Sequence, residues 1–164
     1  MTDKLLQFTM PASFIEQNAR LTPRELHRGY ADGWIDAAAV VELCLRNIVP
    51  DSDPADVVES LSLLLSDELD KVPELIDRLL TDDRGVWVFL ALAYVRAYPF
   101  EFDSILRAVE ILYADFGYPS EMEPFVPFMP PPAGAVPGVA GIEQRWDEYL
   151  QHGRDRYLVQ RSRL

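Results

Sequence analysis

The side chains most often used in catalysis and zinc binding are scarce in this chain. Its 164 residues include two histidines, His27 and His152, and one cysteine, Cys44. The HxxH, HExxH and CxxC spacings that bring zinc ligands together do not occur, and neither do the phosphate-binding GxGxxG or GxxxxGKS/T motifs or the GxSxG nucleophile elbow. We therefore predict no metal ion, no cofactor and no recognisable catalytic motif.

Cys44 lies in the apolar stretch AAAVVELCLRNI. A free cysteine in such surroundings usually behaves as a small hydrophobic side chain. As the only cysteine it cannot form a disulfide within the chain. We predict that it is an inert part of the core.

Carboxylates are abundant, and some are close together in the sequence, for example Asp67, Glu68 and Asp70, or Asp82 and Asp83. A catalytic carboxylate needs an apolar or like-charged pocket that raises its pKa. These carboxylates occur in the most polar part of the chain and lack the glycine-punctuated loop of an EF-hand. A solvated surface is the interpretation that this pattern favours, although a small enzyme with a scattered site stays open.

Charge is the strongest global signal in the sequence. The chain has 15 basic and 27 acidic residues, and the range 51–83 alone carries eleven acids against Lys71 and Arg78. Such a field repels phosphate backbones, so direct binding to nucleic acid is not expected. Two interpretations remain, a solvated surface that keeps the protein soluble and a docking surface for a basic protein. The candidate docking residues are Asp67, Glu68, Asp70, Glu74 and Asp77.

Length and composition indicate one domain, spanning residues 1–164, with enough apolar content (49%) for a core. The start MTDKLLQFTMPASF lacks the pattern of a signal peptide, and the longest apolar run, VWVFLALAYV, has half the length of a membrane span. We expect a cytoplasmic protein without a membrane segment. The sequence leaves its oligomeric state open.

The elements that would hold these residues are predicted to be helices. Thr22-Pro23-Arg24-Glu25 is a capping box that opens a helix to about Asp32, where Gly33 supplies a left-handed stop. Asp36 should cap the next helix, through about Asn47. Asp103 should cap a later one that Gly117 ends, and a last helix should run over about 142–160.

The acidic range is predicted to be the wet side of two amphipathic helices. Asp53-Pro54 opens the first, and apolar residues then recur at helical spacing in both. These two stripes are Val57, Val58, Leu61, Leu64 and Leu65, then Val72, Leu75, Ile76, Leu79 and Leu80. By contrast, the range 86–95 is apolar on every face, which is typical of a helix at the centre of a bundle. The predicted fold is therefore all-α, a helix bundle or a stack of α-hairpins.

The stretch YADFGYPSEMEPFVPFMPPPAG (113–134) contains six prolines and five aromatic residues. A linker would be polar, and aromatic side chains left in water forgo about 1.5–3 kcal/mol each. We predict that this segment, which precedes the last helix, is docked on the helical body, with Tyr113, Phe116 and Tyr118 as anchors. A partner-binding surface using Tyr118 and Phe125 is the alternative, and a linker the third. A flexible loop is expected over residues 131–141.

Three phrases of this chain resemble an uncharacterised bacterial family, a domain of unknown function. They are Glu110-Ile-Leu-Tyr-Ala-Asp-Phe-Gly-Tyr-Pro119, Phe125-Val-Pro-Phe-Met-Pro130 and Trp146-Asp-Glu-Tyr-Leu150, with a weaker match in Leu21-Thr22, Gly29-Tyr30 and Gly33-Trp34-Ile35. The connection after Met129 is longer and richer in Pro, Gly and Ala than the family pattern. The resemblance implies no activity and transfers no site residue. Small acidic bacterial proteins of this kind are often similar to immunity partners of secreted toxins.

Three functional hypotheses follow. The first is a non-enzymatic, immunity-type inhibitor that presents acidic helices to a basic toxin, such as a nuclease. The second is a helical adaptor or regulatory protein that binds through the aromatic segment. The third is a small enzyme, which a cluster of His, Tyr and carboxylate side chains in a deep pocket would favour.

Overall fold

The computed structural model describes residues 6–49, 55–78, 84–130 and 133–163. Its main helices are α1 (Ala12–Asn18), α2 (Pro23–Ala31), α3 (Ala37–Arg46), α4 (Ala55–Ser62), α5 (Val72–Ile76), α6 (Gly85–Ala97), α7 (Ile105–Asp115) and α8 (Gly138–Arg154). Short turns of 3-10 helix are η1 (Leu69–Lys71), η2 (Pro99–Glu101), η3 (Ser120–Phe125) and η5 (Arg161–Arg163), and η4 (Asp155–Val159) is a π-helical turn. The described residues form no strand, and only an isolated bridge joins Leu21 to Ile48. The predicted all-α class is confirmed.

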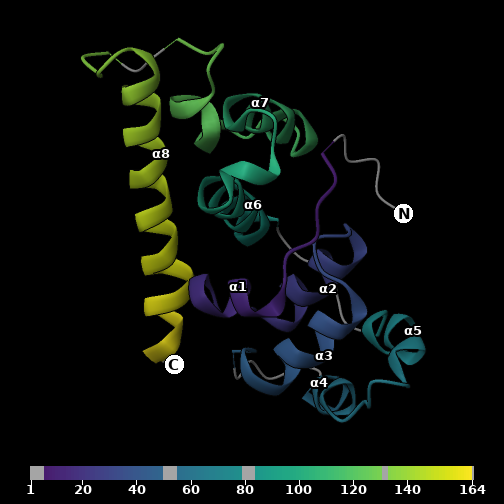
Figure 1. Ribbon diagram of the computed structural model, residues 1–164. Coiled ribbons are helices and arrows are strands. Elements are labelled where there is room, and N and C mark those ends of the chain that lie inside the picture. Colours follow the sequence, from purple (N-terminus) through teal and green to yellow (C-terminus); the bar gives the residue numbers. More distant parts are fainter. Residues whose placement is uncertain (1–5, 50–54, 79–83, 131–132, 164) are drawn as a thin grey trace.

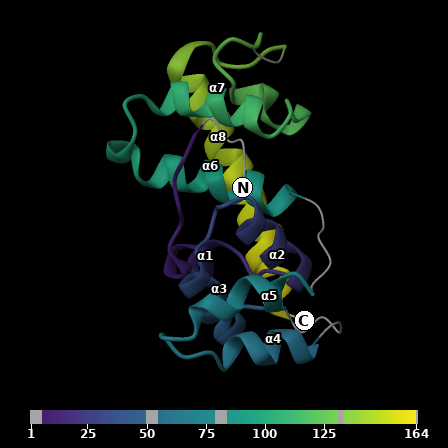
Figure 2. The ribbon, with the colours of Figure 1, turned by 90° about the vertical axis from the view of Figure 1, so that its right-hand side faces the viewer.

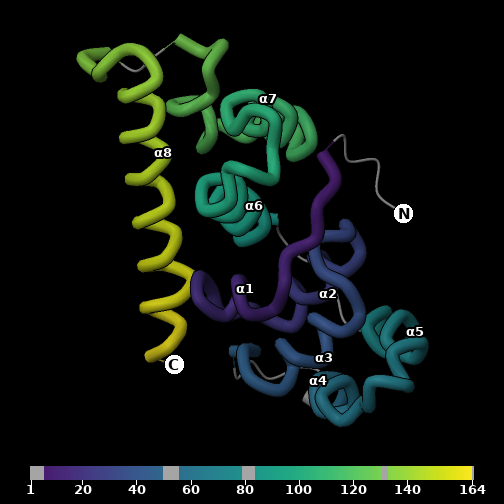
Figure 3. The backbone as a smooth tube through the Cα atoms, viewed as in Figure 1, coloured from purple at the N-terminus to yellow at the C-terminus, as the bar shows by residue number. Residues whose placement is uncertain are grey.

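Helix α8 runs along one side of the molecule and connects its two ends (Figure 1). Helix α6 and the turn η3 pack against α8, α7 packs on α6, and α1 contacts the π-turn η4 that follows α8. Helices α2 to α5 make up the other end, as the view turned by 90° also shows (Figure 2). An extended N-terminal segment joins the two ends (Figure 3), fixed at α7 by the bond from the Leu6 amide to Asp115 (3.0 Å).

Helix α6 is the centre of the core, as its sequence predicts. All ten residues from Val86 to Val95 are buried. Two glycines let other helices reach it, because a Cβ on Gly29 of α2 would lie 2.0 Å from the Trp87 ring and one on Gly153 of α8 would lie 2.1 Å from Phe89. The indole of Trp87 also donates a hydrogen bond to the Glu25 carbonyl (2.7 Å). Close backbone approach therefore locks α6 between α2 and α8.

Several predicted helix ends are confirmed in atomic detail. Thr22 and Glu25 exchange both bonds of a capping box, and Asp36 accepts from the Ala39 amide. Gly33 and Gly117 have positive φ, which ends the helices before them. The cap of α7 is Ser104 rather than Asp103, since the Ser104 hydroxyl accepts from the Arg107 amide.

The two helices of the acidic range are shorter than predicted. Helix α4 ends at Ser62, so Leu64 and Leu65 lie beyond it, and α5 has only five residues. The carboxylate of Glu68 captures the Leu65 amide (3.2 Å), which would otherwise continue the helix, and periodicity alone gives no sign of this competition. The predicted start at Asp53-Pro54, the carboxylates Asp82 and Asp83, and Leu79 and Leu80 lie outside the described residues.

The end of the chain also differs from the prediction. Helix α8 begins at Gly138, so residues 138–141 of the predicted loop form its first turn. A Cβ on Gly141 would lie 1.8 Å from the Val136 carbonyl oxygen, which shows how closely the preceding backbone folds over this turn. After Arg154 the helix widens into the π-turn η4.

The contact between Gly29 and Trp87 makes Gly29→Ala a test of this packing. Alanine is favoured over glycine in a helix by about 1 kcal/mol, whereas overpacking a core costs about 1–3 kcal/mol. The indole is held by Glu25 and cannot move aside freely, so the overpacking cost should be near its upper value of about 3 kcal/mol, and we expect a net loss of about 2 kcal/mol in urea unfolding. Ala31→Ser on the exposed end of α2 is the control and should change stability by about 0.5 kcal/mol or less. A Gly29→Ala variant as stable as the parent would contradict the close packing.

Candidate protein-binding surface

The candidate surface is the acidic segment, residues 55–78, which comprises α4, the following loop, η1 and α5. It lies at the end of the molecule remote from α7 (Figures 1 and 2). It carries seven acidic side chains and two basic ones. Val57, Leu61, Val72 and Ile76 are buried and hold it against the core. The predicted residues Asp67, Asp70, Glu74 and Asp77 are exposed, and Glu68 is half-buried.

Glu68 differs from the other predicted residues because it organises the loop. Its carboxylate accepts from the Leu65 amide and from Lys71 Nζ (2.6 Å), and its own amide donates to the Leu65 carbonyl (2.9 Å). The hydrogen bond from Lys71, followed by that from Leu65, lowers the pKa of Glu68. Glu68 therefore serves the local structure and is not a free docking charge.

Some acidic groups of the segment have partners and some do not. Asp56 pairs with Arg78 (3.3 Å), and Asp77 lies 3.6 Å from the His27 imidazole of α2. Among the described residues, the remaining acids form no ion pair within 4.0 Å. These acids are Glu59, Asp67, Asp70 and Glu74. They leave uncompensated negative charge on a surface that the fold holds in place.

The sequence reasoning missed two residues of this surface. Leu63 and Leu65 are 68% and 64% exposed, whereas Leu64 between them packs against the core. The LSLLLS run gave a signal, since three consecutive leucines cannot share one helix face. The helical stripe had placed Leu65 on the buried side, which is wrong.

The aromatic segment is docked on the helices, as predicted, and two of its three expected anchors are confirmed. Tyr113 and Phe116 are buried anchors, whereas Tyr118 is 64% exposed and adopts a left-handed backbone (φ 62°). Phe125 is 1% exposed and stacks on Trp146 of α8, with ring centroids 6.1 Å apart. Arg145 holds the segment by donating to the Pro124 carbonyl and to the Val136 carbonyl (2.8 Å).

These positions correct two predictions. Tyr118 is not an anchor, because the turn that follows Gly117 directs the chain into an exposed path. Phe125 offers no contact surface for a partner, because Trp146 and Tyr149 enclose it.

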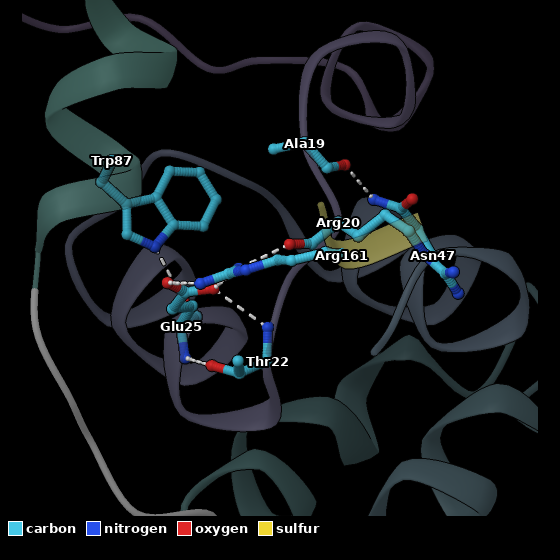
Figure 4. Close-up of polar contacts among 7 residues, drawn as sticks. All are labelled: Ala19, Arg20, Thr22, Glu25, Asn47, Trp87 and Arg161. Atoms are coloured by element: carbon cyan, nitrogen blue, oxygen red, sulfur yellow. Dashed lines mark hydrogen bonds and ion pairs between the residues drawn. The ribbon is translucent and has the colours of Figure 1, made fainter. Parts of the chain in front are cut away.

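A partly buried polar network joins η5 to α2 and α6 (Figure 4). Arg161 of η5 donates to Glu25 of α2 at 2.5 and 3.1 Å and to the Arg20 carbonyl at 2.6 Å. Glu25 also completes the capping box with Thr22, and its carbonyl receives the Trp87 indole. These bonds tie η5 to α2, so the network is a structural clasp for the C-terminal turn.

A small cavity of about 110 Å³ brings together a histidine, tyrosines and a carboxylate. Its lining residues are Glu121, Tyr149, His152, Gly153, Arg156 and Tyr157. Burial, and then the Glu121 carboxylate, raises the pKa of the Tyr149 hydroxyl, so this group stays protonated and acts as a hydrogen-bond donor. It donates to Glu121 over a long 3.4 Å.

Burial also raises the pKa of the Cys44 thiol to about 12, so Cys44 is a weak nucleophile. Within the described ranges, no group of three or more His, Cys, Asp or Glu side chains is arranged to hold a metal ion. No described helix is both long and apolar enough to cross a membrane.

The opposite placement of Phe125 and Tyr118 predicts different costs for their truncation. Phe125→Ala should lower the free energy of unfolding by about 3–5 kcal/mol, because it opens a cavity beside Trp146. Tyr118→Ala should lower it by about 1 kcal/mol or less, since it loses only an edge contact with Tyr113. Denaturant titration of both variants measures the difference, and equal losses would contradict the described path of the segment.

The loop at Glu68 predicts a titration shift. The Glu68 carboxyl, followed by NMR, should titrate below its ordinary pKa of 4.5, because Lys71 and Leu65 stabilise the ionised form. Lys71→Ala should move the midpoint upward by removing the largest cause. The depressed pKa also means that this stabilisation is present at neutral pH and is lost as the pH falls through the folded-state pKa. An unshifted midpoint in the parent protein would contradict the loop geometry.

Comparison with known proteins gives one match. No curated protein and no solved structure shows significant similarity to this sequence. A family model described as an uncharacterised protein conserved in bacteria, DUF2247, matches residues 12–154. That range includes all three phrases on which the sequence resemblance rests, and it leaves out η4 and the Arg161 clasp. The chain therefore belongs to the DUF2247 family of uncharacterised bacterial proteins.

Proposed function

We propose that this chain is a non-enzymatic, cytoplasmic binding protein whose acidic segment docks on a basic protein. The observation that carries the proposal is a set of exposed carboxylates on the segment that form no ion pair with any described residue, Glu59, Asp67, Asp70 and Glu74. A surface serving only solubility would be expected to intersperse both signs of charge. Here the two basic groups are already engaged by Glu68 and Asp56.

The more specific form of the proposal is an immunity-type inhibitor of a basic toxin. A toxin that acts on nucleic acid must present positive charge where phosphates bind, and an acidic surface can occupy that place. Complementary charge speeds encounter and excludes partners of the wrong sign. Pull-down with the products of neighbouring genes, repeated at high salt, would identify the partner.

A second candidate function is an adaptor that binds through the aromatic segment. Tyr118 and Phe128 are 64% and 58% exposed and both contact the buried Tyr113 ring. These two side chains replace Tyr118 and Phe125 as the aromatic candidates. This function would be favoured if a Tyr118→Ala, Phe128→Ala variant no longer captures the partner while variants of the acidic segment still capture it.

Charge reversal tests the acidic docking surface. Asp70→Lys combined with Glu74→Lys should slow association with the basic partner by about tenfold or more at about 0.1 M salt. The effect should shrink at about 1 M salt, where the Debye length is about 3 Å rather than about 10 Å. Stopped-flow or surface-based association rates provide the measurement.

The matched control is Asp103→Lys combined with Glu123→Lys, which changes the net charge equally at exposed positions outside the acidic segment. It should slow association much less. If both pairs of substitutions slow association equally, only the net charge matters. If the Asp70→Lys, Glu74→Lys protein associates as fast as the parent at low salt, the acidic segment is not the docking surface.

A further inference from the structure

The loop between α4 and η1 presents two large aliphatic side chains that folding does not use. Leu63 and Leu65 leave more than three fifths of their surface in water. Leu64 fills the inward position between them and packs against the core. Polar side chains at 63 and 65 would leave the packing of Leu64 unchanged, so the fold of the described residues does not require an apolar pair at these positions.

The exposure of this pair results from an ordered turn. The Leu63 amide donates to the Glu59 carbonyl (3.2 Å), and the Leu64 amide to the Leu61 carbonyl (3.3 Å). The reciprocal bonds between Leu65 and Glu68 then close the loop, and Lys71 fixes the Glu68 carboxylate. A pair that is already held in its exposed position loses little conformational freedom when a partner covers it.

Acidic groups with no ion pair among the described residues flank the two leucines in the chain. Glu59 precedes Leu63 by one helical turn, Asp67 lies two residues after Leu65, and Asp70 belongs to η1. Exposed apolar side chains with a polar rim are typical of protein interaction sites. The sign of this rim selects the occupant, because a second copy of the chain, an anionic lipid surface and a nucleic acid would all bring further negative charge.

We propose that Leu63 and Leu65 are the apolar anchors of the acidic surface, and that they receive a protein segment in which apolar side chains are flanked by lysine or arginine. This inference rests on the proposed function and names the chemistry of its partner. The acidic rim steers the approach of the segment and makes it salt-dependent. The leucines add short-range burial that salt does not screen and that slows dissociation.

The experiment uses two labelled synthetic peptides of equal length and charge, an amphipathic Lys/Leu helix and a Lys/Ser counterpart, measured by fluorescence anisotropy. The parent protein should bind the Lys/Leu peptide about tenfold or more tightly than the Lys/Ser peptide. Leu63→Ser with Leu65→Ser should abolish this preference while binding to the Lys/Ser peptide persists. Leu63→Ala with Leu65→Ala should reduce it, and helical content and melting temperature should stay at parent values in both.

Leu45→Ser is the matched control, since Leu45 of α3 is 58% exposed but lies outside the acidic segment. It should keep the preference. An unchanged preference in the Leu63→Ser, Leu65→Ser protein would overturn the anchor role and leave the acidic docking surface standing. Two results would overturn the proposed function and this inference together. In one, the parent protein binds neither peptide; in the other, Asp70→Lys combined with Glu74→Lys does not weaken the binding.

The parent protein could also be a dimer that Leu63→Ser combined with Leu65→Ser converts to a monomer. This result would show that the occupant is a second copy of the chain, and it would overturn the inference.

Discussion

The fold depends on burying a helix that is apolar on every side. Helix α6 has no polar face to give to water, so other elements must enclose it completely, and side chains normally keep packed helices about 8–10 Å apart. Gly29 of α2 and Gly153 of α8 remove that barrier at Trp87 and Phe89. Their missing side chains let backbone pack directly on large aromatic rings. The positions of α2 and α8 are thus fixed by two aromatic rings of α6, those of Trp87 and Phe89.

The polar groups around this centre reinforce the same arrangement. Glu25 caps α2 with its carboxylate, receives Trp87 through its carbonyl and pairs with Arg161, so one residue joins α2, α6 and the C-terminal turn. The Arg161 guanidinium also lies over the Tyr157 ring of the π-turn, 5.0 Å from its centroid. The buried charge of Glu25 is stabilised because every part of the group has a partner.

The acidic segment uses the core differently. Val57, Leu61, Val72 and Ile76 bury one side of it, and its other side carries charge and two exposed leucines. The same Glu68 carboxylate that ends α4 early also turns Leu63 and Leu65 outward. Of the apolar stripe that the pattern predicts, only Leu65 becomes part of the surface, whereas Leu61 stays buried and Leu64 packs against the core.

The sequence by itself determined the features that depend on near neighbours in the chain. The all-α class, the capping box at Thr22, the left-handed glycines 33 and 117 and the burial of residues 86–95 all follow from spacing and local chemistry, and all are confirmed. The acidic character of residues 55–78 was equally evident, and the fold leaves Asp67, Asp70 and Glu74 exposed as expected. Only the tertiary structure decided that Phe125 is enclosed, Tyr118 exposed, Glu68 committed to its own loop and Leu63 and Leu65 presented to solvent. Each of those outcomes is set by a competing partner or by packing at a distance, such as Trp146 against Phe125, and local periodicity carries no information about such contacts.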